Sequence, residues 1–332
     1  MLIIASIGLN STPEDKIKKI ILAGADIIRY NFAHRVLSDN IEYVRNGKRI
    51  IEELHAGIKV MIDLPNNKVR LGHFNNIIHP VNEGQELTLK SAPFSPDCNE
   101  FIPIETKKIG NELNPDQTVT IGDGEVAIQI LEIVNEDTVK ARALNNGVIK
   151  SMKSFNAQLY FDDENYLKYC RDILEKIKEL EPEYLVIPYL NEKIHKQIME
   201  LIKINKINSK IAIKIENKIS ENKIKEFYND NSYQFVTIDL GELGVNMPFE
   251  QMGKFYNSII SNVKRHQKTL VMTHILESSI YNYVPNRSEI INLTNMVVNG
   301  IKGIILCHET NLGIRPAYTI HTAKKIISEA QK

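Results

Sequence analysis

Short apolar runs recur along the chain, with amphipathic segments between them. The eight runs are Leu2–Ile7, Asp26–Phe32, Lys59–Leu64, Tyr184–Leu190, Lys210–Glu216, Gln234–Gly241, Thr269–Ile275 and Lys302–Cys307. Each run is nearly continuously apolar rather than alternating, which is typical of parallel strands covered on both faces. Eight such strands predict an α/β fold, a (β/α)8 TIM barrel. An open doubly wound sheet is the alternative, although no GxGxxG motif follows any run.

Helical signals fill most of the gaps between these runs. The first helix is predicted to begin with a capping residue in Ser11-Thr12-Pro13-Glu14 and to close at Ala23-Gly24. The other predicted helices span Val36–His55, Asp163–Leu180, Asn191–Ile204, Ser220–Tyr228, Phe249–His266, Arg287–Asn299 and Pro316–Ala330. This alternation of strand and helix supports the barrel.

One connection, between the third run and the helix near Asp163, lacks a helical period for about 90 residues. It contains the extended runs Gln85–Lys90, Thr118–Ile121, Glu125–Val134 and Thr138–Leu144, with hairpin-type turns at Gly122-Asp123-Gly124 and Asn135-Glu136-Asp137. A structureless loop of that length is implausible. We therefore expect a barrel domain of residues 1–72 and 158–332, and an inserted small β-barrel domain of residues 73–157 that could act as a lid.

Composition narrows the functional classes. The chain has 332 residues, 41 basic and 41 acidic, so bulk charge favours neither a nucleic-acid nor a membrane surface. Its three cysteines are widely spaced without a CxxC, which argues against a disulfide framework or a zinc ribbon. The apolar N-terminal run is too short for a signal sequence, and no stretch approaches about 18 apolar residues. We expect a cytoplasmic protein; a homo-oligomer is compatible with the sequence.

Candidate chemistry gathers at the C-terminal ends of the predicted strands, where barrel enzymes place their active sites. Lys214 and Glu216 lie two apart on one strand, so both side chains point to the same face. Burying two charges is costly unless they are paired or occupied. A lysine serving phosphoryl or proton transfer beside a metal-binding carboxylate is one interpretation, and a buried ion pair that only closes the barrel is the other.

A second carboxylate, Glu242, follows the next strand in Gly241-Glu242-Leu243-Gly244. Two carboxylates, completed by substrate oxygens and water, suit Mg²⁺ or Mn²⁺. A solvated loop glutamate is the alternative for Glu242. His34, His274 and His308 also fall near strand ends, and without an HxxxH or HExxH spacing we interpret them as hydrogen-bonding residues of the site wall. For Cys307 we favour a buried small side chain that packs in the interior, and a nucleophile is the less favoured alternative.

Several motifs together resemble the pyruvate kinase family, in family order along the whole chain. They are Ala5-Ser6-Ile7-Gly8, the run from Ala23 to His34, Lys214-Ile215-Glu216-Asn217, Gly241-Glu242-Leu243-Gly244-Val245, Thr273-His274-Ile275-Leu276-Glu277-Ser278, Pro285-Asn286-Arg287-Ser288-Glu289 and Glu309-Thr310-Asn311-Leu312-Gly313. Any single motif is weak, whereas their combination is specific. The resemblance implies a barrel with a lid domain and phosphoryl transfer between phosphoenolpyruvate and ADP, giving pyruvate and ATP.

The resemblance also implies roles for single residues at the phosphate site. Lys214 would stabilise the phosphoryl group in flight, Arg29 would neutralise it, and Thr273 would help to protonate the enolate. The remaining implied residues are Asn31, Asp63, Lys68 and Gly241 for substrate and phosphate binding, Glu216 and Glu242 for the metal, and Arg70, Asp123, Lys153 and His34 near the nucleotide.

Lys68 stands where the family usually has a glutamate, and this resembles members that work without K⁺. A tethered ammonium can replace a monovalent cation beside a phosphate. Ala33 and Leu64 remove two oxygens that would coordinate K⁺, which fits the same interpretation. Neutral drift at an unused site is the alternative.

Other departures alter the surroundings of the site. Leu240 replaces an arginine of the family pattern, Glu242 an aspartate and His274 a glutamine, while Pro188-Tyr189-Leu190-Asn191 replaces Ser-Phe-Val-Arg. We also expect a short form that lacks the family's common C-terminal regulatory domain. Two further hypotheses therefore stay open: a diverged homologue acting on an enolpyruvate or 2-oxo acid in a specialised biosynthetic pathway, and a catalytically silent binding protein.

Overall fold

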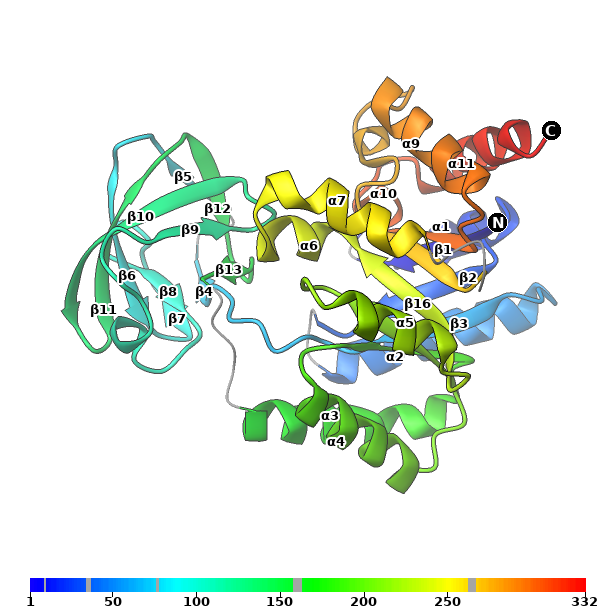
Figure 1. Cartoon of the computed structure of the whole chain (residues 1–332), viewed down its shortest axis with the longest axis horizontal. Coiled ribbons are helices and arrows are strands. Elements are labelled where there is room, and N and C mark those ends of the chain that lie inside the picture. Colours follow the sequence, from blue (N-terminus) through cyan, green and yellow to red (C-terminus); the bar gives the residue numbers. More distant parts are fainter. Residues whose placement is uncertain (9, 34–36, 76–77, 158–162, 262–266) are drawn as a thin grey trace. The chain divides into compact units, whose positions relative to one another are not determined.

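The computed structural model describes residues 1–8, 10–33, 37–75, 78–157, 163–261 and 267–332 (Figure 1). These divide into two compact units. The barrel unit comprises Met1–Asn66, Leu167–Leu243 and Met247–Lys332, and the β unit comprises Asn67–Tyr166 with Gly244–Asn246. The expected inserted domain of residues 73–157 lies within this β unit.

Eight parallel strands of the described chain close into a barrel in the order β1-β18-β17-β16-β15-β14-β3-β2. Their bounds are β1 Leu2–Ile7, β2 Ile27–Asn31, β3 Lys59–Asp63, β14 Tyr184–Pro188, β15 Lys210–Ile215, β16 Tyr233–Asp239, β17 Thr269–Met272 and β18 Gly303–Leu306. Each overlaps one of the eight apolar runs of the sequence. The TIM barrel is confirmed, and the open doubly wound sheet is excluded because β1 pairs with β18.

Helices lie between and outside the barrel strands, as their amphipathic patterns predict. They are α1 Glu14–Leu22, α2 Leu37–Glu53, α3 Asp163–Ile177, α4 Glu192–Ile204, α5 Glu221–Asn229, α6 Leu240–Asn246, α7 Phe249–Ile260, α9 Arg287–Val298, α10 His308–Asn311 and α11 Pro316–Ala330, with short 3₁₀ turns η1 Ile109–Asn111, η2 Lys178–Leu180 and η3 Glu277–Ile280. Figure 1 shows α9, α11, α1 and α2 as successive neighbours on the outside of the barrel. No helix in the described ranges is long and apolar enough to cross a bilayer.

Local capping explains where several helices begin. The side chains of Asn191 and Ser220 accept hydrogen bonds from backbone amides in the first turns of α4 and α5. Asn286 forms a capping box with Glu289 at the start of α9. The side-chain cap expected for α1 is wrong: Pro13 precedes its first turn, and the Ser11 hydroxyl instead accepts a hydrogen bond from the Gly8 amide.

The barrel interior is a packed apolar layer rather than a pore, as usual for this architecture. It includes Ile4, Ile27, Met61, Ala212, Phe235 and Ile305, all buried and each from a different strand. Side chains two residues further along a strand point to the same face. The next layer toward the C-terminal ends of the strands is therefore Ser6, Arg29, Asp63, Lys214, Thr237 and Cys307. A floor of apolar side chains thus supports a layer of polar ones.

The β unit contains strands β4 His73–Phe74, β5 Ile78–Val81, β6 Glu86–Ser91, β7 Phe94–Ser95, β8 Ile102–Ile104, β9 Thr118–Ile121, β10 Val126–Asn135, β11 Thr138–Ala143, β12 Gly147–Lys150 and β13 Phe155–Asn156. Within the described residues they form a six-stranded sheet, β13-β9-β10-β11-β6-β8, and two two-stranded sheets, where we expected a small closed barrel. Both predicted hairpins are present, at the β9–β10 and β10–β11 turns. Whether this unit acts as a lid stays a prediction.

Candidate active site

Arg29 and Asp63 form a buried ion pair at the ends of β2 and β3. Arg29 Nε and Nη2 donate to Asp63 Oδ2 over 3.0 and 2.6 Å, while Nη1 donates to Ser6 Oγ over 2.8 Å. The Arg29 and Asp63 side chains are 3% and 0% exposed. Burial works against both charged forms, but the net effect is a raised pKa for Arg29 and a lowered pKa for Asp63, because each stabilises the charge of its neighbour.

Lys214 joins this pair from β15. Its Nζ lies 3.0 Å from Asp63 Oδ1 and 3.1 Å from Glu216 Oε1. Although burial opposes the charged form, Asp63 and Glu216 raise the Lys214 pKa overall. Lys214 is therefore an ammonium at neutral pH, suited to stabilising negative charge and not to accepting a proton.

Glu216 lies at the end of β15 and is 2% exposed. Asn66 Nδ2 donates to Glu216 Oε1 over 3.4 Å. Burial raises the pKa of Glu216 to about 7, Glu242 and Asp239 add to the rise, and Lys214 opposes it. Arg29, Asp63, Lys214 and Glu216 thus form a continuous network of alternating charges, referred to below as the buried charge layer.

Asp239, at the end of β16, is a site residue that the sequence analysis missed. Its Oδ1 accepts hydrogen bonds from Thr273 Oγ1 over 3.1 Å and from the Glu242 amide over 3.3 Å. Burial raises the pKa of Asp239 to about 6, with Lys214 opposing the rise and Glu242 adding to it. A signal was present, because Phe235, Thr237 and Asp239 alternate along the strand and therefore share the inner face.

Thr273 connects β17 to the start of α6. Its Oγ1 accepts a hydrogen bond from the Gly241 amide over 2.6 Å, which brings these two predicted substrate-binding residues together. Thr273 and His274 have φ angles of 63° and 51°, a left-handed conformation that is unusual for residues with a Cβ. Such backbone costs about 1–3 kcal/mol per residue and persists where the surroundings enforce it, often at functional sites.

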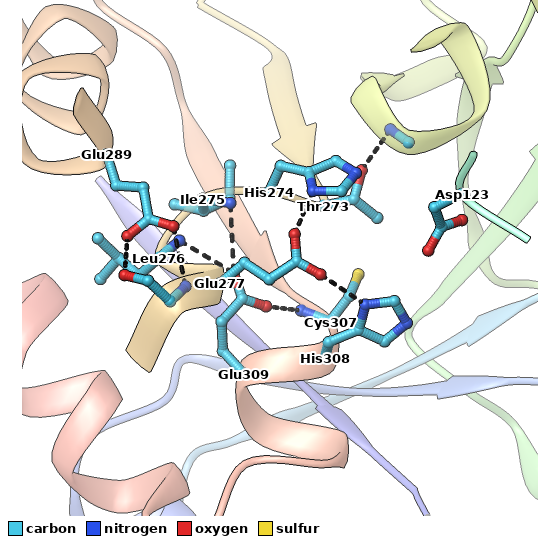
Figure 2. Close-up of polar contacts among 12 residues, drawn as sticks. Asp123, Thr273, His274, Ile275, Leu276, Glu277, Glu289, Cys307, His308 and Glu309 are labelled. Atoms are coloured by element: carbon cyan, nitrogen blue, oxygen red, sulfur yellow. Dashed lines mark hydrogen bonds and ion pairs between the residues drawn. The ribbon is translucent and has the colours of Figure 1, made fainter. Parts of the chain in front are cut away.

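Polar contacts around Glu277 tie the ends of β17 and β18 together (Figure 2). Glu277 hydrogen-bonds to His274 Nδ1 through Oε2, and to His308 Nδ1 through Oε1 over 3.0 Å. Hydrogen bonds from His274 and His308 hold the pKa of Glu277 well below its usual range, despite partial burial. The interpretation of these two histidines as hydrogen-bonding residues is confirmed.

Glu309 supports the loop that carries His274. Its Oε1 accepts from the Ile275 and Leu276 amides over 3.2 and 3.0 Å, and its Oε2 accepts from the Cys307 amide over 2.7 Å. Cys307 is buried as expected, and burial raises the pKa of its thiol to about 12. A protonated thiol is a poor nucleophile, so the structural interpretation of Cys307 holds.

The other predicted residues are distributed over both units. In the barrel unit, Asn31 Oδ1 accepts a hydrogen bond from the Ala33 amide over 3.0 Å. The remaining ones, Lys68, Arg70, Asp123 and Lys153, belong to the β unit. There, Lys68 Nζ donates to Asn156 Oδ1 over 3.4 Å, Arg70 Nη1 donates to the Met152 carbonyl over 3.2 Å, and Lys153 Nζ lies 3.9 Å from Asp123 Oδ2. His34 lies outside the described residues.

The donor chemistry of the barrel site fits a hard divalent cation. No group of three or more histidine, cysteine, aspartate or glutamate side chains placed to hold a metal occurs among the described residues. Burial and, to a lesser extent, the charge of Glu242 raise the pKa of Glu216, which a bound cation would offset. Mg²⁺ is usually held by one or two carboxylates, with waters and substrate oxygens in its other positions. Two carboxylates therefore suffice for Mg²⁺ or Mn²⁺.

Comparison with known proteins gives a consistent family. The model of the pyruvate kinase barrel domain matches residues 1–320. A pyruvate kinase of Buchnera aphidicola is 26% identical over 340 residues, covering 99% of this chain and 69% of the relative. A pyruvate kinase of Thermococcus litoralis is 24% identical over 338 residues, with the same coverage of both chains.

Among solved structures, Cryptosporidium parvum pyruvate kinase in complex with ADP superimposes with a TM-score of 0.88 at 22% identity. The match covers 99% of this chain and 67% of that one. At this identity the structural likeness supports the fold and no finer property.

Proposed function

The chain belongs to the pyruvate kinase family, and on that premise we propose that it transfers a phosphoryl group between phosphoenolpyruvate and ADP, giving pyruvate and ATP. At the level of the family it is a kinase-type phosphotransferase. The observation that carries the proposal is the buried charge layer, in which two cations alternate with two carboxylates above an apolar floor. Fixed charges in a site of low dielectric are suited to stabilising a transferring phosphoryl group.

Each residue of this layer has a part in the proposed reaction. Lys214, kept protonated by Asp63 and Glu216, stabilises the phosphoryl group in flight. Arg29 neutralises the same group, and its orientation is fixed because Asp63 and Ser6 bind three of its nitrogen atoms. Charges held in place by such contacts stabilise the transferring group with little reorganisation.

Glu216 and Glu242 are the residues that would hold Mg²⁺ or Mn²⁺, and the bound cation would neutralise oxygens of the enolpyruvate and phosphate. Asn31, Gly241 and Thr273 are assigned to the wall of the substrate site. Arg70, Asp123 and Lys153 of the β unit are assigned to the nucleotide, as the family pattern implies. Lys68 is assigned the place of K⁺, so the reaction should not require that ion. A cytoplasmic location belongs to the same proposal.

Formation of pyruvate from phosphoenolpyruvate and ADP tests this function. We expect Mg²⁺- or Mn²⁺-dependent turnover by the purified chain and none by its Lys214→Met variant. Absence of pyruvate with either metal would contradict the proposal.

The second candidate is a diverged enzyme that uses the same site on another enolpyruvate or a 2-oxo acid. His274 favours it, because the pair that it forms with Glu277 changes the surroundings of Thr273. Binding of oxalate, an enolpyruvate mimic, without pyruvate formation would support this candidate. Failure to bind Mg²⁺ or Mn²⁺ by calorimetry would instead support a silent binding protein.

A further inference from the structure

His274, Glu277 and His308 form a cluster for which the proposed phosphoryl transfer has no role; it is called the His–Glu–His cluster below. His274 follows β17, Glu277 begins η3 and His308 begins α10. Each carboxylate oxygen of Glu277 takes one imidazole: Oε2 takes His274 Nδ1 and Oε1 takes His308 Nδ1 over 3.0 Å. Figure 2 shows the two rings at the two carboxylate oxygens of Glu277, with the His274 ring next to Thr273.

This arrangement fixes which nitrogen of each ring exchanges a proton. An ionised carboxylate only accepts hydrogen bonds, so both Nδ1 atoms must donate. Nε2 is then the nitrogen that gains or loses a proton in each imidazole. A carboxylate at the other ring nitrogen also makes an imidazole more basic, which is how histidines are activated in catalytic and metal sites.

The cluster is both accessible and firmly held. The side chains of His274, Glu277 and His308 are 43%, 31% and 34% exposed, so the two rings can exchange protons with solvent. The backbone that carries His274 is held on one side by the Gly241–Thr273 hydrogen bond. On the other side it is held by the two amides that donate to Glu309. An accessible imidazole on a fixed backbone is suited to acid–base chemistry.

We propose that His274, in place of the neighbouring Thr273 that the family resemblance implies, is the proton-exchanging residue of this site, with Glu277 and His308 as its positioning groups. The inference rests on the proposed function. After the phosphoryl group has left, a proton on His274 Nε2 passes through an intervening water to the methylene carbon of the enolate. The electron pair of the carbon–carbon double bond forms the new C–H bond, and the enolate oxygen becomes the ketone oxygen of pyruvate. The neutral imidazole then takes a proton from solvent.

The charged groups around His274 bear on its titration. Glu277 contacts His274 directly, and His308 is linked to His274 through the Glu277 carboxylate. Glu309 on α10 interacts electrostatically with Glu277. On α9, Glu289 binds Ser278 next to Glu277. Asp239 binds the hydroxyl of the preceding Thr273. Removal of the Glu277 carboxylate, which accepts the hydrogen bond from His274 Nδ1, should lower the basicity of His274.

Deuterium exchange at the methyl group of pyruvate isolates this step from phosphoryl transfer. The exchange is followed by ¹H NMR in D₂O with Mg²⁺ and ATP, across a pH series. We expect His274→Gln to slow exchange by about tenfold or more. General acid–base catalysis contributes about 100-fold at the lower end of its range, and water should replace part of what the variant loses. Glu277→Gln should move the pH midpoint of exchange downward. His321→Gln, an exposed change on α11, is the matched control and should exchange as the wild type does.

Three results would overturn the inference, and they separate it from the proposed function. If His274→Gln forms pyruvate and exchanges deuterium at the wild-type rate, His274 is not the proton-exchanging residue, and the proposed function is unaffected. NMR evidence that His274 carries its neutral-state proton on Nε2 removes the geometry on which the assignment depends. A wild-type chain that neither exchanges deuterium nor forms pyruvate removes both the inference and the proposed function.

Discussion

Arg29 donates two hydrogen bonds to a single oxygen of Asp63, from Nε over 3.0 Å and from Nη2 over 2.6 Å. The other oxygen of Asp63 is thereby left for Lys214, 3.0 Å away. One carboxylate from β3 thus positions a cation from β2 and another from β15. Because all three side chains are buried, each depends on the others to remain charged.

Asp63 should make stability depend on pH at the acidic end. Its pKa is lowered in the folded state, because Lys214 and Arg29 outweigh the effect of burial. A group with a depressed folded pKa contributes stability above its unfolded pKa of about 3.9, and this stability is lost as pH falls through the folded value. Asp63→Asn should therefore cost about 3–5 kcal/mol of unfolding free energy at pH 7, and less below pH 4.

Urea unfolding of wild type and Asp63→Asn at pH 7 and in steps down to pH 3 measures this difference. Asp15→Asn is the control, since Asp15 is exposed on α1, and its difference from wild type should stay within about 0.5 kcal/mol. A difference for Asp63→Asn that is the same at every pH would show that the charge of Asp63 is not responsible.

Lys214→Met should remove activity and also weaken the fold. Loss of the ammonium leaves Asp63 and Glu216 without their shared partner, at a cost of about 3–5 kcal/mol. Loss of a fixed charge at the phosphoryl group should lower kcat by about 100-fold or more. Lys214→Arg keeps the charge and should stay closer to the wild-type stability, while still losing activity because a planar guanidinium does not replace a compact ammonium.

Steady-state kinetics and urea unfolding on both variants separate the two effects. The control is Lys218→Met, an exposed lysine shortly after the same strand. An active Lys214→Arg variant would mean that position 214 needs only a positive charge, and an active Lys214→Met variant would remove Lys214 from the mechanism.

The barrel could be predicted because its strands are buried on both faces, so that each appears as a continuous apolar run. Lys214 and Glu216 could be predicted because charges inside such a run require a partner. That partner could not be named from the pattern: Asp63 lies on another strand, and only the closed barrel brings the two together. Asp239 is also a charge inside an apolar run, which is the signal that identified Lys214. It was missed because attention at that strand went to the glycine-containing segment after it, Gly241-Glu242-Leu243-Gly244.

The His–Glu–His cluster could not be predicted from the sequence. His274 and His308 were noted as strand-end residues, but their common partner Glu277 belongs to a 3₁₀ turn. Neither a period of two nor one of 3.6 applies to such a turn. The bounds of the β unit have no comparable signal in the sequence, because chain segments that join a domain have no periodicity that distinguishes them from linkers.

Lys68 should make the enzyme independent of K⁺. The side chain is buried in the β unit, where Nζ donates to Asn156. If its ammonium takes the place of the monovalent cation, turnover should be the same in K⁺ and in tetramethylammonium salts of equal ionic strength. Lys68→Glu should lower turnover about tenfold or more without K⁺ and recover part of it when K⁺ is added, since the ion restores the missing charge. Strong activation of the wild type by K⁺ would contradict this assignment.

Gly241 should be intolerant of a methyl group for reasons of geometry. A Cβ at this position would lie 3.1 Å from Thr273 Oγ1 and 3.5 Å from Asp239 Oδ1. The Gly241 amide also donates to Thr273, so a shift of a few tenths of an ångström would disturb the loop on which Thr273 and His274 are held. We expect Gly241→Ala to fold and to lose about 10- to 100-fold in kcat, because misplacement of catalytic groups by such distances is costly.

Gly253→Ala is the matched control: a Cβ there meets nothing within 4 Å in α7. Alanine in a helix should raise the unfolding free energy by about 0.5–1 kcal/mol and leave kcat unchanged. Equal kcat in the two variants, measured by steady-state kinetics, would mean that the close approach of Gly241 to Thr273 has no part in catalysis.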